Sequence, residues 1–273
     1  MKSKAIILLF LLALTTVCYG QSGSSDLLEI KFKKLRDDIY LAYRPETLRY
    51  WVEGNVIIII NDADVVVVDG SGSPRSAQSV IAEIRKLTNK PVRDIRQSEY
   101  RKVKRTPPTM TVAKSMRLYR GNRTIEIVHL GAGDTPGDLI VYLPQDRIVC
   151  TGDMVTEPVP FGFSRYPLEW LATLNQLSQL EFDTLIPGHG EVQQGKVYLR
   201  SVITLLQSVQ DQVKAGIAAG LDHEGVRKQV DLSKFERQFA GDDPVYRDYF
   251  REYFSDPNVE RTFNALKAKA GQK

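Results

Sequence analysis

Cysteine is scarce in this sequence, with two in 273 residues. One of them, Cys18, lies in an N-terminal apolar segment, so the loss of that segment would leave Cys150 alone. A single cysteine excludes an intrachain disulfide, and the fold must then rely on its apolar core for stability. About 250 residues are enough for one large core or for a domain with a helical appendage.

Long apolar runs are also scarce. The longest, Ala5 to Leu14, follows two lysines and precedes small and polar residues that end at Gly20. This order is typical of a secretory signal, whereas a membrane-spanning helix needs about 20 apolar residues. We therefore predict a signal peptide over residues 1–20 and an exported protein, periplasmic or extracellular. An uncleaved N-terminal anchor is the alternative.

The sequence lacks a marked excess of charge of either sign. It has 37 basic and 33 acidic residues, a net charge of +4 that falls to +2 when Lys2 and Lys4 are removed with the signal. A nearly neutral chain offers no electrostatic basis for binding nucleic acid. The expected partner is a small-molecule substrate, with no nucleic acid and no membrane contact beyond signal-directed export.

Short apolar runs alternate with turns and helices. The runs at residues 55–60 and 65–69 flank the turn "NDAD" and predict a hairpin whose strands are buried on both faces. An amphipathic helix is expected in "SPRSAQSVIAEIRKL", four strands between residues 115 and 150, and a long helix that ends at Gly220. Two blocks of strands, each followed by a helix, together with a helical tail, predict an α/β or α+β layered domain.

Polar residues gather where the apolar strands end. Asp69 ends "VVVVD", Asp134 lies in "GAGDTPGD", Asp153 ends "IVCTGD" and His189 follows "TLIP". Neighbouring glycines let the backbone turn sharply, and strand ends at one sheet edge are where such folds place their sites. Imidazole and carboxylates together suit zinc, iron or manganese. Each residue alone is equally an ordinary turn or cap residue, so spacing leaves both interpretations open.

Three motifs carry a resemblance to a known family. "NVIIIINDADVVVVDGSG", "GDTPGDLIVYLPQDRIVCTGDMV" and "FDTLIPGHGEV" resemble the metallo-β-lactamase superfamily in its broad hydrolase branch. The resemblance covers roughly Ile39 to Val192. It implies a four-layered αββα sandwich over residues 21–195, here shortened, and a C-terminal helical extension over residues 196–273.

The resemblance also implies a metal site. Asp153 matches the aspartate that bridges two metals in the family. His189 matches the histidine, late in the sequence, that binds the second metal. Asp69 matches the aspartate that orients the site without binding metal. Asp134 stands where the family commonly has the histidine of "GHTPGD", and it is a candidate third ligand. The implied cofactor is a divalent metal, zinc first, with iron or manganese as alternatives.

One family motif has no counterpart in the chain. The motif H-x-H-x-D-H is expected after the strand "KPVRDI", from about residue 95, and nothing of that kind follows. Neither of the two other histidines replaces it: His129 is expected to be packed or hydrogen-bonded at its strand, and His223 to be a solvated surface residue. The predicted metal site is therefore incomplete, with one metal ion or none.

An aromatic, proline-rich segment follows Asp153. In the family this segment borders the site, so its aromatic residues are candidates for lining a pocket, and core packing beneath the next helix is the equal alternative. The residues concerned are Phe161, Phe163, Tyr166 and Trp170.

The sequence thus predicts an exported, metal-dependent hydrolase-like protein with an incomplete metal site and no confident catalytic residue. It does not separate ester, thioester and lactone substrates. The alternative is a non-catalytic scaffold or binding protein that has lost its active site, or the product of a gene that has lost a segment.

Overall fold

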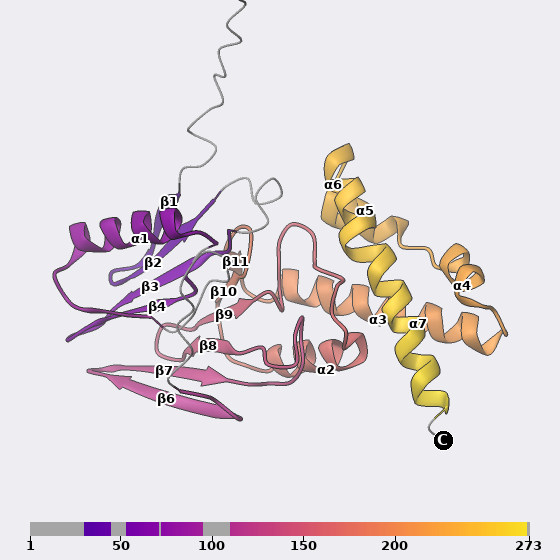
Figure 1. Cartoon of the computed structure of the whole chain (residues 1–273), viewed down its shortest axis with the longest axis horizontal. Coiled ribbons are helices and arrows are strands. Elements are labelled where there is room, and N and C mark those ends of the chain that lie inside the picture. Colours follow the sequence, from indigo (N-terminus) through magenta and orange to yellow (C-terminus); the bar gives the residue numbers. More distant parts are fainter. Residues whose placement is uncertain (1–29, 45–52, 71, 95–109, 272–273) are drawn as a thin grey trace, which may run out of the picture.

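The computed structural model describes residues 30–44, 53–70, 72–94 and 110–271, and within these ranges the strands form two sheets (Figure 1). The first sheet has the order β1-β2-β3-β4-β5 and the second β11-β10-β9-β8-β7-β6. The strands are β1 (Lys31–Arg36), β2 (Ile39–Tyr43), β3 (Val56–Ile60), β4 (Val65–Val68), β5 (Val92–Asp94), β6 (Ser115–Arg120), β7 (Arg123–Val128), β8 (Ile140–Leu143), β9 (Ile148–Gly152), β10 (Thr184–Pro187) and β11 (Gln193–Gln194). Most neighbours are antiparallel, but β4 with β5 and β9 with β10 are parallel pairs.

The helices lie outside the two sheets and in the C-terminal part (Figure 1). They are α1 (Pro74–Leu87), α2 (Pro167–Leu177), α3 (Val197–Ala218), α4 (His223–Gln229), α5 (Ser233–Ala240), α6 (Pro244–Tyr249), the π-helix η3 (Phe250–Ser255) and α7 (Asp256–Gly271). The helix α1 begins at Pro74, directly after the cap residue Ser73, whose Oγ accepts a hydrogen bond from Ser76 N. Such a cap satisfies a backbone donor that the first turn leaves unpaired.

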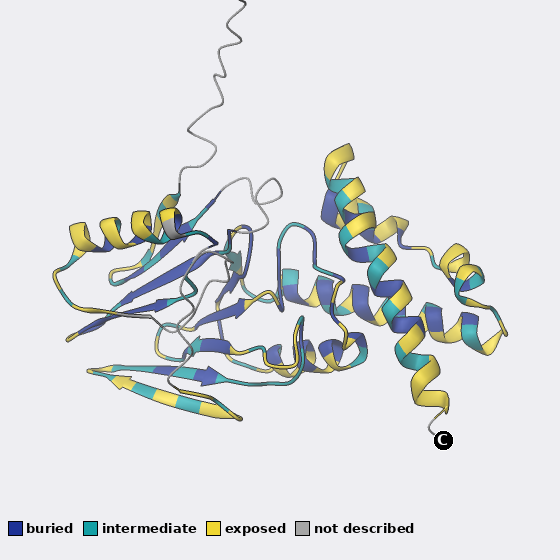
Figure 2. Cartoon of the chain, viewed as in Figure 1, coloured by how far each residue is buried: buried dark blue, intermediate teal, exposed yellow. Residues whose placement is uncertain are grey.

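Alternation along the buried strands produces the layers. In β3, Val56 and Ile58 pack with Val80 and Ile84 of α1, whereas Ile57 and Ile59 face the second sheet. In β9, Ile148 and Cys150 face the first sheet, whereas Val149 packs with the helices α2 and α3. Because successive side chains point to opposite faces, these inner strands are buried on both faces, and Figure 2 shows them mostly in the colour of buried residues. The predicted four-layered αββα arrangement is confirmed.

The C-terminal helices share an apolar core with the second sheet. Phe250 and Phe254 of η3 and Val259 of α7 belong to the same buried cluster as Val149 of β9 and Trp170 of α2. All of these side chains are at most 2% exposed. The last helix of the predicted tail packs against α2 and α3, which continue this core toward the second sheet. Figure 2 shows buried residues along these helices.

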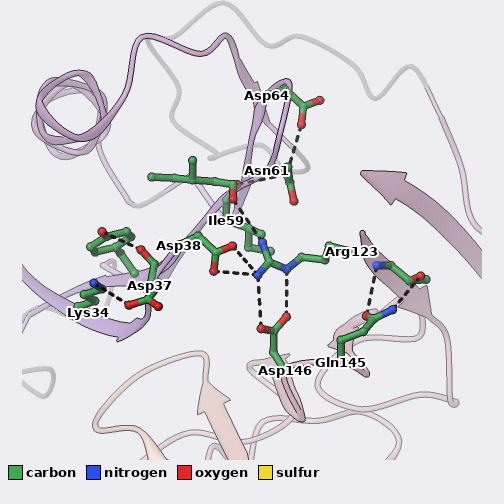
Figure 3. A network of polar contacts seen from close by, with 12 residues as sticks. Lys34, Asp37, Asp38, Ile59, Asn61, Asp64, Arg123, Gln145 and Asp146 are labelled. Carbon is green, nitrogen blue, oxygen red and sulfur yellow. Dashed lines mark hydrogen bonds and ion pairs between the residues drawn. The ribbon is translucent and has the colours of Figure 1, made fainter. Parts of the chain in front are cut away.

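A polar network joins the two sheets at one end. Arg123, at the start of β7, donates from Nη2 to Asp38 Oδ1 and Oδ2 at 2.8 and 2.7 Å, and from Nε to Asp146 Oδ2 at 3.0 Å (Figure 3). Its Nη1 also donates to Ile60 O at 3.3 Å. Asp38 lies between β1 and β2, and Asp146 lies between β8 and β9, so one guanidinium on β7 ties both of these turns and the end of β3 together. We call this the Arg123 end.

Two expectations lie outside the described residues: the signal peptide over residues 1–20, and the junction from about residue 95 where the histidine motif is absent. None of the described helices is long and apolar enough to cross a membrane.

Candidate functional site

The candidate residues follow strands whose ends lie opposite the Arg123 end. Asp69 follows β4, Asp153 follows β9 and His189 follows β10, while Asp134 lies in the loop from β7 to β8. Since β9 and β10 are parallel, their carboxyl ends meet at one edge. We call this edge the Asp153–His189 edge.

The turn that carries His189 is held by a side chain from the first sheet. Asn55, just before β3, donates from Nδ2 to the carbonyl oxygens of Pro187 and Gly190, each at 2.9 Å. Its backbone N donates to Gly188 O at 2.7 Å. Asn55 is 2% exposed, so it positions the turn from beneath. On the other side, Glu157 N donates to His189 O at 3.1 Å.

The position of Gly188 requires glycine. A Cβ there would lie 2.3 Å from Asp153 Oδ1 and 2.6 Å from the carbonyl carbon of Gly152. Both approaches are closer than real Cβ atoms show, so any side chain would push the histidine turn away from the end of β9. The absence of a side chain at Gly188 therefore brings Asp153 and His189 together.

His189 is almost fully buried and paired with Asp153. Its Nε2 lies 3.4 Å from Asp153 Oδ1, and its side chain is 9% exposed. The ring meets the Phe161 ring edge-on, with centroids 5.5 Å apart, and Nδ1 is buried with no hydrogen-bond partner among the described residues. Asp69 is close by, because a Cβ at Gly54 would lie 3.8 Å from Asp69 Oδ2 and 3.9 Å from His189 Nε2.

Asp134 lies in an acidic part of the same edge. Asp138 holds its loop, since the backbone N atoms of Asp134 and Thr135 donate to Asp138 Oδ2 at 2.7 and 3.2 Å. Burial raises the pKa of Asp134 to about 6, and the negative charges of Asp153 and Asp138 add to the rise. The positive charge of Arg261 opposes it.

The donor set fits a metal ion in part. Two donors on a tetrahedral zinc, with bonds of about 2.0–2.2 Å, lie roughly 3.3–3.6 Å apart. The 3.4 Å between His189 Nε2 and Asp153 Oδ1 matches this spacing. A catalytic zinc takes three protein ligands, and the described ranges contain no group of three His, Cys, Asp or Glu side chains that could hold a metal.

The four aromatic candidates have different surroundings. Phe161 contacts His189, and Phe163 and Tyr166 are 40% and 37% exposed. Trp170 is 1% exposed, and its Nε1 donates to Met154 O at 3.0 Å within the core beneath α2. Trp170 is thus surrounded as a core residue is, which agrees with core packing and not with lining a pocket.

The C-terminal part supports this aromatic segment, and sequence reasoning missed the contact. Gly162 N donates to Tyr253 O at 2.7 Å, and a Cβ on Gly162 would lie 2.4 Å from Phe254 O. The Cζ of Arg261 lies 5.4 Å from the centre of the Phe163 ring. A glycine between two phenylalanines was the one signal in the sequence that a neighbouring backbone approaches closely.

The two remaining histidines lie away from the His189–Asp153 pair. His129 follows β7, and its Nε2 is hydrogen-bonded to Pro136 O at 3.1 Å, as expected. The expectation for His223 was wrong. Its ring is half-buried edge-on against Phe263, and its Nε2 is buried with no hydrogen-bond partner among the described residues. The cause is the packing of α4 against α7.

Comparisons with known proteins agree on the fold. No family model matches the chain. The linear primary-alkylsulfatase of Pseudomonas sp. (strain ATCC 19151) is 23% identical over 158 residues, which cover 54% of this chain. The match spans only 28% of that relative's length.

Solved structures are similar over larger parts of the chain. The DIM-1 metallo-beta-lactamase has a TM-score of 0.55 and 19% identity, and the match covers 66% of this chain and 98% of that one. The sec-alkylsulfatase Pisa1 from Pseudomonas sp. has a TM-score of 0.64 and 12% identity, with 86% of this chain and 50% of that one covered. The chain therefore has the metallo-β-lactamase fold.

Proposed function

We propose that this chain is an exported, metal-dependent hydrolase-like protein with an incomplete metal site. In this proposal His189 and Asp153 hold one divalent ion, zinc first, and Asp134 is a candidate third donor. Asp69 orients the site without binding the ion. A divalent ion held there would supply the Lewis acidity that hydrolysis requires.

The spacing of His189 and Asp153 is the observation that carries the proposal. Their donor atoms lie 3.4 Å apart at the carboxyl ends of two parallel strands. Asn55 and the close approach at Gly188 hold the two side chains there. A buried histidine with an acidic neighbour, placed by two such supports, indicates a binding site more than a chance turn.

The proposed substrate is a small molecule. The metallo-β-lactamases and alkylsulfatases that share the fold are named for β-lactam and sulfate-ester substrates. Sulfate esters therefore join carboxylic esters, thioesters and lactones as the classes to be screened. The exposed aromatic rings of Phe163 and Tyr166 would border the apolar part of such a molecule.

Metal content of the purified protein tests the proposal. After loading with zinc, iron or manganese and removal of excess metal, elemental mass spectrometry is expected to find about one ion per chain, the occupancy of a single site. The His189→Ala variant is expected to lose the ion. The matched control His129→Ala removes a histidine from the neighbouring loop and is expected to retain it. Wild-type protein without stoichiometric metal would contradict the proposal.

A second candidate is a binding protein without catalysis. The observation that favours it is the contact of His189 with Asp153 itself, together with the lack of a three-donor group among the described residues. In that case ligands bind at the Asp153–His189 edge of metal-free protein, and no ester, lactone or sulfate ester is turned over at any metal concentration.

A further inference from the structure

Among the half-buried or buried arginines that the structure describes, Arg261 is the one without an ion pair to a described carboxylate. It lies on α7, its Cζ is 5.4 Å from the centre of the Phe163 ring, and its Nη1 is buried with no hydrogen-bond partner among the described residues. Among the described residues no carboxylate lies within ion-pair distance of it. By contrast, Arg123 is paired with two aspartates. Arg44 also has buried nitrogens without a hydrogen-bond partner, but its charge is paired with Glu53.

An unpaired guanidinium donor away from water is costly. A buried donor without an acceptor loses its hydrogen bonds to water and forms none with the protein. The free-energy cost is larger for a charged group. Such atoms are rare in native structures, and an absent ion or ligand is one recognised reason for them. The planar guanidinium suits two-point binding of carboxylate, sulfate or phosphate.

The surroundings of Arg261 connect it with the Asp153–His189 edge. Phe163, over whose ring the Arg261 guanidinium lies, is two residues from Phe161, whose ring contacts His189. Gly162 between them is hydrogen-bonded to Tyr253 O, so this segment is fixed to the same C-terminal part that carries Arg261. The charge of Arg261 also reaches Asp134.

We propose that Arg261, whose guanidinium lies over the Phe163 ring, binds an anionic group of the small molecule held at the Asp153–His189 edge. The ligand is an organic anion, with a carboxylate or a sulfate group at Arg261 and an apolar portion against Phe163 and Tyr166. The proposal rests on the proposed function in placing the ligand at that edge, and it needs no metal. It makes Arg261 the residue that selects charged over neutral substrates.

Ligand pairs that differ only in charge test this role. Isothermal titration of metal-free protein, kept in chelator, with 1-hexanesulfonate, hexanoate and 1-hexanol compares one apolar chain with a sulfonate, a carboxylate and a hydroxyl group. At least one anion is expected to bind about tenfold or more tightly than the alcohol, in line with a charge-assisted hydrogen bond. The two anions compared with each other identify the preferred head group.

Variants assign the selectivity to Arg261. Arg261→Gln is expected to bind the anions no more tightly than the alcohol, and Arg261→Lys to retain part of the preference, because it keeps the charge but not the planar fork. The matched control Arg227→Gln removes an exposed arginine of α4 whose partner is Glu224, and it is expected to bind as the wild type does. Circular dichroism and thermal unfolding confirm that each variant is folded.

Two results would overturn the proposal: wild-type protein that binds the alcohol as tightly as both anions, or a folded Arg261→Gln variant with unchanged anion affinity. Both are separate from the metal result, because the titrations use metal-free protein. Loss of stoichiometric metal with intact anion selectivity would contradict the metal site alone.

Discussion

The Arg123 end and the Asp153–His189 edge lie at opposite ends of the same strands, and their buried polar groups differ in how well they are hydrogen-bonded and charge-paired. At the Arg123 end one guanidinium has two carboxylates and a carbonyl oxygen as partners. At the other end, His189 Nδ1 and Arg261 Nη1 are buried with no hydrogen-bond partner among the described residues, and Asp134 faces acidic neighbours. Near the Arg123 end Asn61 Oδ1 is also buried without such a partner, but the other polar atom of that amide, Nδ2, is hydrogen-bonded. Satisfied networks hold a fold together, whereas unsatisfied and perturbed groups mark sites where something else binds.

The largest expected effect is on the Arg123 end. Arg123→Ala leaves Asp38 and Asp146 without their cation, and Asp146 is only 14% exposed. Removal of one partner from a largely buried ion pair costs about 3 kcal/mol. We expect the free energy of unfolding, measured by urea denaturation, to fall by that amount, with little change in ligand or metal binding.

Arg117→Ala is the control for this variant. Arg117 is 61% exposed and paired with Glu126 on neighbouring strands, and an exposed pair contributes about 0.2–1 kcal/mol. Equal losses in the two variants would mean that the Arg123 network does not hold the sheets together.

Two buried asparagines allow a matched comparison of the two ends. Asn55 holds the histidine turn through Pro187 O and Gly190 O, whereas Asn61 bonds Ile59 O and Asp64 near the Arg123 end. Each alanine variant leaves buried acceptors unpaired and is expected to lower the free energy of unfolding by about 1–3 kcal/mol.

Only Asn55→Ala is also expected to weaken metal binding, by about tenfold. The reason is that the hydrogen bonds of Asn55 hold the turn that orients His189. Competition with a chromophoric chelator measures this affinity in both variants. Equal metal affinities would show that the Asn55 contacts stabilise the fold without shaping the site.

The smallest expected effect concerns Asp134 in metal-free protein. Its pKa is about 6 in the folded chain and 3.8 in ordinary surroundings, so the folded state prefers the protonated form. The charged form therefore lowers stability above pH 6, and this cost disappears as the pH falls below about 4.

Asp134→Asn removes that cost. We expect the variant to be about 1 kcal/mol more stable than wild type at pH 7, a figure reduced for the partial exposure of the carboxylate. The difference is expected to vanish at pH 4, as measured by urea unfolding at both pH values. A difference that is the same at both pH values would place its origin outside the ionisation of Asp134.

Much of the fold could be predicted because its signals are local. The β-branched runs that became β3 and β4, the proline and serine at the start of α1 and the apolar run of β10 each indicate an element within a few residues. The order of three motifs then indicated the four-layered sandwich. Asp153 and His189 could be singled out because each ends a strand beside a glycine.

The contacts that shape the site could not be predicted, because they join distant parts of the chain. Asn55 bonds atoms 132 and 135 residues away, and nothing near Asn55 in sequence indicates these partners. The position of Arg261 over the Phe163 ring depends on the packing of α7, which no local pattern indicates. Burial of His223 followed from the same packing, which depends on the whole core and not on local periodicity.

The contact between Gly162 and the backbone of η3 has a consequence for how such proteins can be recombined. The segment after Asp153 fits this tail only because it has no side chain at that point. The DIM-1 match covers 98% of that chain but only 66% of this one, so much of this chain has no counterpart there. If residues 157–166 were replaced by a segment from such a chain, any side chain at the position of Gly162 would collide with the backbone of Phe254. A chimaera of two such proteins is therefore expected to fold well only when this segment and the C-terminal helices come from the same parent.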